Sequence, residues 1–196
     1  NITSIQLPDG ITTIKNGAFG YCQSLQSINM PSSLISIGDY AFEWCNSIDE
    51  LHLNDGLETI GKSAFFGCSA DNVLVIPKSV KSVGEKAFYY CKNIKEVKFL
   101  GDTLLDEKSF GFCPEYDNEL LPDFEIYGSY GNVSKYCKES NIKFNPQDNS
   151  LDFNLDSNID LLDYLSIKSA YMYSNNNDDI STSNLLLVKK YILDVI

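Results

Sequence analysis

Apolar residues recur at a fixed interval along the first three quarters of the chain. An Ala-Phe pair returns every 23 residues, from Phe19 to Phe88, and one further phenylalanine, Phe110, follows after a step of 22. A cysteine stands three residues after each of these phenylalanines. A fixed period of this size is typical of stacked supersecondary units, because a single unit cannot bury its apolar face alone. The pattern predicts a solenoid rather than a closed globule.

Each unit has the same order of apolar and polar positions. A short alternation comes first, as in SINMP at Ser27 to Pro31, and predicts a strand. An apolar pair spaced by three follows, as in Leu34 and Ile37, and then Gly and an Ala-Phe-x-x-Cys turn. Equivalent positions of neighbouring coils face each other in a solenoid, so we expect a core of Ile/Leu, Phe and Cys columns.

The same register predicts two surface columns. Solenoids commonly bind partners along extended faces, and the outward side of the strands would form such a face. Its two rows are Gln6, Asn29, His52, Val75, Lys98 and Glu125, and beside them Ser4, Ser27, Glu50, Val73 and Glu96. A second column consists of the hydroxyl residues Thr13, Ser36, Thr59 and Ser82, which we interpret as a structural hydrogen-bond ladder.

These units, of the form LPxxLxxIGxxAFxxC, resemble BspA-like (Treponema-type) leucine-rich repeats. The resemblance covers residues 1 to about 144 and implies an α+β fold, a leucine-rich-repeat solenoid capped at its C-terminal end. The segment from Phe124 to Phe144 resembles the strand and helix that close such arrays. Asn1 begins almost directly in a repeat strand, so we expect a signal peptide and earlier repeats to precede it.

A different pattern begins at residue 151. Residues 152–163 read DFNLDSNIDLLD and place side-chain oxygens at loop positions one, three, five, nine and twelve, which is the spacing of a calcium loop. An Asp/Asn-rich solvated linker is the alternative, but it explains neither the spacing nor the apolar stretch that follows. Ser157 replaces the usual Gly of such loops. The predicted ligands, with a carbonyl at position seven, are Asp152, Asn154, Asp156, Asn158, Asp160 and Asp163.

A second, weaker copy of the loop follows when Ile180 is aligned with Ile159. Tyr173 stands at its first position and no carboxylate at its twelfth, so the loop has little charge to offset the dehydration of Ca²⁺. We therefore expect one calcium site in the first loop and leave a second site open. The candidate ligands of the second loop are Asn175, Asn177, Asp179, Ser181 and Asn184.

This duplicated loop and helix resembles a type I dockerin, a module that attaches bacterial enzymes and accessory proteins to cohesins on a cellulosome scaffold. The resemblance covers Leu151 to Ile196 and implies a small all-α, EF-hand-like module after a linker at residues 145–150. The family's cohesin-contacting positions fall on Leu161, Leu162, Lys168, Thr182, Ser183, Lys189 and Lys190. Alternatively, the two leucines are core residues of a helical unit and Lys189 and Lys190 a solvated helix end.

Charge and length narrow the classes of partner. The chain has 27 acidic residues against 15 lysines and no arginine, for a net charge of -12. This balance argues against nucleic acid or an anionic membrane as partner. No apolar run in the sequence is long enough to span a bilayer.

The reactive residue types do not form a catalytic pattern. Five of the six cysteines recur at one core position with parallel side chains, so we expect a buried ladder of free thiols, with Cys137 in the same role. His52 is the only histidine, and we expect it to be solvated, with no Ser or Cys nucleophile beside it. The carboxylates form no pair suited to glycoside hydrolysis. We interpret the chain as non-catalytic.

We expect a secreted, extracellular protein at the cell surface or in a cellulosome. Its dockerin would bind a scaffoldin cohesin in a calcium-dependent way, and its repeats would bind a protein or glycan that the sequence does not identify. The alternative is a surface adhesin whose repeat face binds a host or cell-surface protein or glycan, with the tail as a structural calcium module. The outward column has no aromatic or Arg anchor, which counts against an adhesin. An enzyme whose catalytic domain lies outside this sequence is the third class.

Overall fold

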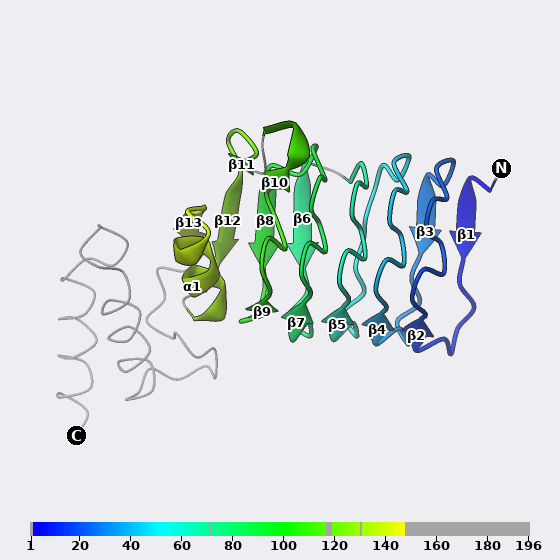
Figure 1. Ribbon diagram of the computed structural model, residues 1–196. Coiled ribbons are helices and arrows are strands. Elements are labelled where there is room, and N and C mark those ends of the chain that lie inside the picture. Colours follow the sequence, from blue (N-terminus) through cyan, green and yellow to red (C-terminus); the bar gives the residue numbers. More distant parts are fainter. Residues whose placement is uncertain (1, 71, 117–118, 130, 148–196) are drawn as a thin grey trace, which may run out of the picture.

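The computed structural model describes residues 2–70, 72–116, 119–129 and 131–147. Their coils lie side by side, from strand β1 (Ser4–Gln6) at one end to helix α1 (Asn132–Glu139) at the other (Figure 1). The predicted repeat solenoid is confirmed as an array of mostly short strands, with α1 as the single α-helix of the described part. The dockerin-like module expected at 151–196 lies outside the described residues.

One surface of the array is a continuous parallel sheet, here called the five-stranded sheet. Its strands are β2 (Thr13–Ile14), β4 (Ser36–Ile37), β5 (Thr59–Ile60), β7 (Ser82–Val83) and β9 (Leu104–Leu105), in that order. The last pairing joins Ser82 to Leu104, one residue short of the period, whereas Thr103 still donates its hydroxyl hydrogen to the Val80 carbonyl at 2.9 Å. The deletion therefore lies between Thr103 and Leu104, which explains the shortened step to Phe110.

The other surface, here called the strand face, is divided into two parallel sheets. β1 pairs with β3 (Ser27–Asn29). The second sheet has the order β13-β12-β8-β6, with β6 (Val73–Ile76), β8 (Glu96–Phe99), β12 (Glu125–Gly128) and β13 (Lys143–Pro146). Residues 49–54 between the sheets form no strand, which corrects the strand expected around His52. Asp49, Glu50 and Asn54 are of types that are depleted in strands.

The core consists of the predicted columns. Successive rings from Phe19 to Phe110 stack with centroids 5.3, 5.1, 5.1 and 4.8 Å apart. The thiols of Cys45, Cys68 and Cys91 each donate to a phenylalanine carbonyl of the preceding coil at 3.0 to 3.1 Å. All six cysteines are free thiols, as expected from the sequence. Burial raises the pKa of the Cys91 thiol to about 12.

The C-terminal end of the array carries the predicted cap of strand and helix. α1 buries Val133, Tyr136 and Cys137 against the last coil. The Asp102 carboxylate, from the loop after β8, accepts the backbone N–H groups of Asn132 at 2.7 Å and Val133 at 3.4 Å. It thereby satisfies donors that a helix N-terminus leaves without intrahelical partners.

Two further features lie around the cap. β13 continues through Pro146, past the boundary expected at residue 144. A short antiparallel pair, β10 (Phe112–Cys113) with β11 (Glu119–Leu120), and a 3-10 turn at Pro114–Tyr116 lengthen the coil before β12. None of the helices in the described part combines the length and apolar character needed to cross a membrane.

Candidate binding surfaces

The strand face presents most of the outward column in the predicted order, with one correction. Gln6 pairs with Asn29, and Val75 pairs with Lys98. The next partner of Lys98 is Tyr127, because Glu125 pairs with Glu96 in the neighbouring row. The Lys98 ammonium lies 5.7 Å from the centre of the Tyr127 ring, within the range of a cation–π contact. The outward column therefore does contain an aromatic residue.

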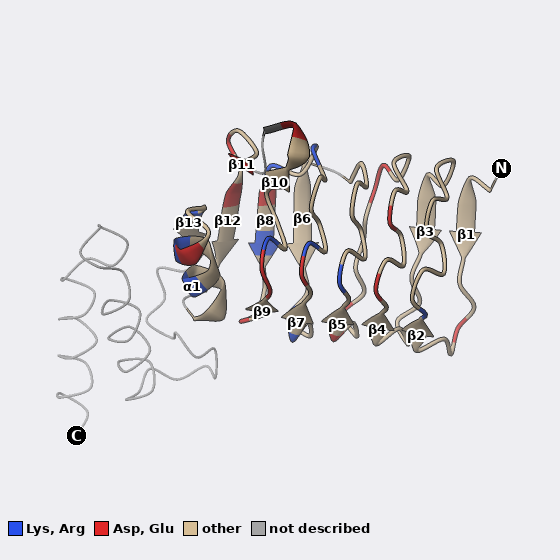
Figure 2. Cartoon of the chain, viewed as in Figure 1, with Lys and Arg blue, Asp and Glu red and all other residues tan. Residues whose placement is uncertain are grey.

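Charge on the strand face gathers at its C-terminal half. Figure 2 shows charged residues on β8 and β12, whereas β1, β3 and β6 have none. The Glu125 carboxylate accepts hydrogen bonds from Lys143, from the Tyr127 hydroxyl at 2.9 Å and from the Asn145 amide at 2.9 Å. The Lys143 hydrogen bond, followed by that of Tyr127, lowers the pKa of Glu125. This half of the face thus offers a polar cluster around one ring.

His52 lies on the open surface, as predicted. Its Nε2 is 3.5 Å from the Glu50 carboxylate, and 82% of its side chain is exposed. A hollow of about 380 Å³ beside it is lined by Ser4, Ser27 and other residues of the first coils. The two serines belong to β1 and β3, and no hydrogen bond joins either hydroxyl to His52 within the described residues. The geometry provides no activated nucleophile at this position.

A larger hollow runs along the outward side of the five-stranded sheet and is here called the groove. Its volume is about 880 Å³, and it crosses five coils from Thr13 to Asp106. Its floor carries one hydroxyl residue in each of the first four coils, and the strand partner of Ser82 in the fifth coil is Leu104. The Ser36 hydroxyl donates to the Thr13 hydroxyl at 2.9 Å, as the predicted ladder requires. Thr59 and Ser82 do not extend this ladder within the described part of the chain.

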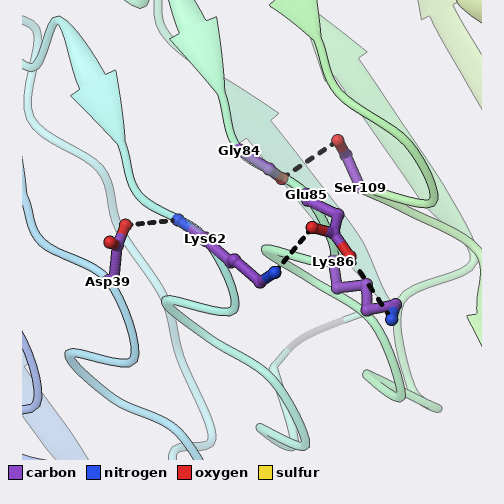
Figure 3. A network of polar contacts seen from close by, with 6 residues as sticks. All are labelled: Asp39, Lys62, Gly84, Glu85, Lys86 and Ser109. Carbon is purple, nitrogen blue, oxygen red and sulfur yellow. Dashed lines mark hydrogen bonds and ion pairs between the residues drawn. The ribbon is translucent and has the colours of Figure 1, made fainter.

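One wall of the groove begins as a ladder of side chains and backbone. Asn16 Oδ1 accepts the Asp39 N–H at 3.0 Å, and Asp39 Oδ1 accepts the Lys62 N–H at 2.8 Å. The ammonium of Lys62 then pairs with Glu85 at 2.7 Å, and Lys86 pairs with the second Glu85 oxygen at 3.3 Å (Figure 3). The Lys62 hydrogen bond, and then that of Lys86, lowers the pKa of Glu85. The central charges of the wall are therefore mutually compensated.

Partly buried aromatic side chains gather at the turns that follow the core phenylalanines, here called the aromatic ridge. The Trp44 ring packs edge-on against Phe66 at 5.3 Å and Tyr90 at 5.4 Å. Trp44 and Tyr90 meet across Gly67, where a side chain would lie 2.7 Å from the indole. The Tyr90 hydroxyl and the Lys92 ammonium both bond to one oxygen of Glu115, at 2.9 and 2.6 Å.

The aromatic ridge was not predicted from the sequence. The signal for it was available, because Lys92 and Glu115 are one period apart, as are Lys62 and Glu85 in the groove wall. Opposite charges spaced by one repeat indicate side chains that face each other on neighbouring coils. The same spacing joins Glu58 to Lys81, whose charged atoms lie 2.8 Å apart.

The predicted calcium ligands and cohesin contacts, from Asp152 to Lys190, all lie outside the described residues. In the part of the chain that the structure does describe, no three His, Cys, Asp or Glu side chains are grouped so that they could hold a metal ion. Metal binding therefore stays a prediction about residues 151–196.

Comparison with protein families identifies the repeat. Residues 1–117 match the family model described as BspA type leucine-rich repeat region, of six copies. Curated proteins give no significant sequence match to the chain.

Two solved structures, PcpA and TpLRR, show the same fold. The pneumococcal vaccine antigen PcpA is 19% identical, with a TM-score of 0.56 over 76% of this chain and 42% of that one. The T. pallidum leucine-rich repeat protein TpLRR is 20% identical, with a TM-score of 0.50 over 73% of this chain and 85% of that one. A leucine-rich repeat protein from Bacteroides ovatus ATCC 8483 is 22% identical, with a TM-score of 0.47 over 66% of this chain. The chain spans 40% of the Bacteroides protein and 42% of PcpA.

Proposed function

Because the chain belongs to the BspA-type leucine-rich repeat family, we propose that it is a non-catalytic, secreted interaction protein. In this proposal the repeats bind a protein or glycan partner, and residues 151–196 form a dockerin-like module that attaches the repeats to a scaffold cohesin. The observation that supports the repeat half is the array of extended faces, each built from equivalent positions of successive coils. The tail half is supported by the calcium-loop spacing of residues 152–163.

Calcium has a specific task in this proposal. The first loop supplies four carboxylates, at Asp152, Asp156, Asp160 and Asp163, to a cation that prefers oxygen ligands. A metal that binds only the folded module stabilises that module by mass action. Calcium would therefore order the loop and hold its helix in the form that the cohesin recognises.

Several observations support a non-catalytic role for the repeats. The sole histidine is exposed beside a carboxylate, and the central charges of the groove wall are compensated by each other. General acid–base catalysis needs a group poised near the operating pH and within reach of the reacting atom. Hydrogen bonding moves the pKa of Glu85 in the opposite direction, below its ordinary value.

The test is a calorimetric titration of the full chain with a panel of type I cohesins, in calcium and then in excess EDTA. We expect tight binding that chelation abolishes. Asp152→Asn removes a predicted ligand and should abolish binding as well. Asp178→Asn is the matched control, because it removes one carboxylate outside the predicted ligand set. Binding that persists in EDTA, or equal losses in the two variants, would contradict the calcium mechanism.

A surface adhesin is the second candidate, and two observations favour it. Tyr127 in the outward column and the Trp44 cluster of the aromatic ridge are residue types enriched at binding hot spots. An adhesin would bind cells in EDTA and lose that binding in Trp44→Ala or Tyr127→Ala. If the chain binds cells only in the presence of both calcium and a cohesin, the adhesin is excluded.

A further inference from the structure

We propose that the groove binds a neutral, β-linked glycan chain laid across the coils, with the hydroxyl residues of its floor as the contact row. This inference rests on the proposed function of the repeats as a binding module and names the ligand class of one of their faces. The four hydroxyl residues, Thr13, Ser36, Thr59 and Ser82, all line the groove.

The floor has hydrogen-bonding capacity to spare. Ser36 and Thr13 bond to each other, whereas the hydroxyls of Thr59 and Ser82 bond to no other side chain or carbonyl of the described residues. Each free hydroxyl can donate one hydrogen bond and accept two. The backbone groups beneath them pair with the neighbouring strands, so a ligand in the groove has to bond to side chains.

The electrical balance of the groove favours a neutral ligand. Lys62 and Glu85 pair at 2.7 Å in the middle of the wall, and Glu85 also pairs with Lys86. The remaining charges of the lining are Lys15, Asp39 and Asp106. A phosphate or carboxylate polymer would meet no uncompensated row of cations here. A neutral polymer that carries hydroxyl groups requires no row of cations for binding.

The spacing of the floor separates a glycan from a peptide. Neighbouring parallel strands lie about 4.8 Å apart, so the hydroxyl residues repeat at that interval. An extended peptide presents like-facing groups only every two residues, about 6.7 Å, and loses register after one or two coils. A β-1,4-linked glucan is straight, each sugar residue adds a length close to the coil interval, and alternate sugars are turned over. Like-facing sugars therefore recur at about every second coil, so a glucan laid along the floor stays in register with it.

The row also has a defined end. The fifth coil places Leu104 where the first four have a hydroxyl residue, and 59% of that side chain is exposed. The polar floor thus spans four coils. Affinity should rise with chain length up to about four sugars and then level off, because further sugars find no matching hydroxyl.

The experiment titrates the full chain with cellobiose, cellotetraose and cellohexaose, by calorimetry in EDTA. We expect cellotetraose to bind more tightly than cellobiose and about as tightly as cellohexaose. The double variant Thr59→Val, Ser82→Ala should bind cellotetraose about tenfold or more weakly, since it removes two hydroxyls. Ser27→Ala, on the strand face, is the control and should bind normally. Circular dichroism verifies that each variant is folded.

The outcomes separate this inference from the proposed function. No binding of cellotetraose, or undiminished binding in the double variant, overturns the groove assignment. The double variant should still bind cohesin in calcium like the unaltered chain. Cellotetraose binding without any cohesin binding would retain the groove assignment and refute the scaffold role alone.

Discussion

The five-stranded sheet and the strand face come from the same coils, yet only the first is unbroken. In the five-stranded sheet, a glycine follows the strand in three successive coils, at Gly38, Gly61 and Gly84, and a side chain there would lie within 2.7 Å of the preceding coil. On the strand face no glycine directly follows β1, β3 or β6, and Glu50 stands where neighbouring coils have Ser27 and Val73. Close packing between coils keeps one surface regular, whereas the other is free to vary in sequence.

The largest expected effect tests the core that both surfaces share. Phe65→Ala removes a buried ring stacked between Phe42 and Phe88, and should lower the free energy of unfolding by about 3–5 kcal/mol. Phe19→Ala should cost less, because its ring is partly exposed and stacks on one neighbour only. Urea unfolding measures both. Equal losses would mean that the column does not carry the stability of the array.

Alkaline pH should weaken the same core. Burial raises the pKa of Cys91 and Cys137 to about 12 from an ordinary value of 9.0. The folded state therefore holds these protons more tightly, so stability is intact below pH 9 and falls as pH rises above it. The slope is about 1.4 kcal/mol per thiol and pH unit. Urea unfolding from pH 8 upward measures it, and Cys91→Ala should flatten the slope; an unchanged slope would contradict the assignment.

Gly61→Ala should disturb the five-stranded sheet and leave the strand face largely intact. The new methyl group would lie 2.6 Å from the Asp39 nitrogen, and overpacking of this kind costs roughly 1–3 kcal/mol. Gly20→Ala is the matched control, since its nearest contact would be 3.4 Å away. Amide hydrogen exchange locates the damage. Loss of protection confined to β6 and β8 would be the opposite of the expected result.

Asp102→Ala tests the cap that closes both surfaces. The variant removes the acceptor for the first N–H groups of α1 and should cost about 1 kcal/mol. Asp9→Ala, at an exposed position of the first coil, should be close to neutral. Thermal unfolding of the two variants gives the comparison, and an unchanged midpoint for Asp102→Ala would show that the helix needs no such cap.

The smallest expected effect comes from a substitution at the break between the two sheets of the strand face. Glu50→Thr replaces a residue of low strand propensity and should stabilise the chain by about 0.5 kcal/mol while slowing exchange of the Leu51 amide. Glu107→Thr, an exposed position outside the sheets, should leave that amide unchanged. If Leu51 exchanges as fast as before, the break has a cause other than the residue at position 50.

The core could be predicted from the sequence because the period alone determines which residues stack. The error at Glu125 arose where the period ends: the β10–β11 pair lengthens the last coil, so counting from Lys98 no longer finds its partner. Val97 and Phe99 are buried on either side of Lys98. Aligning the buried residue Ile126 with Val97 would have placed Tyr127 beside Lys98. The groove wall and the aromatic ridge depend on side-chain contacts between coils. The only sequence signal for these contacts was the spacing of opposite charges by one repeat.

The central claim is that the repeats and a calcium-dependent tail have separate roles. Amide hydrogen exchange on the full chain, with calcium and with EDTA, tests this claim most directly. We predict that chelation removes protection from residues 151–196 and leaves the five-stranded sheet and the Phe19 to Phe110 column unchanged. A tail whose exchange ignores calcium, or repeats that lose protection when calcium is removed, would contradict the account.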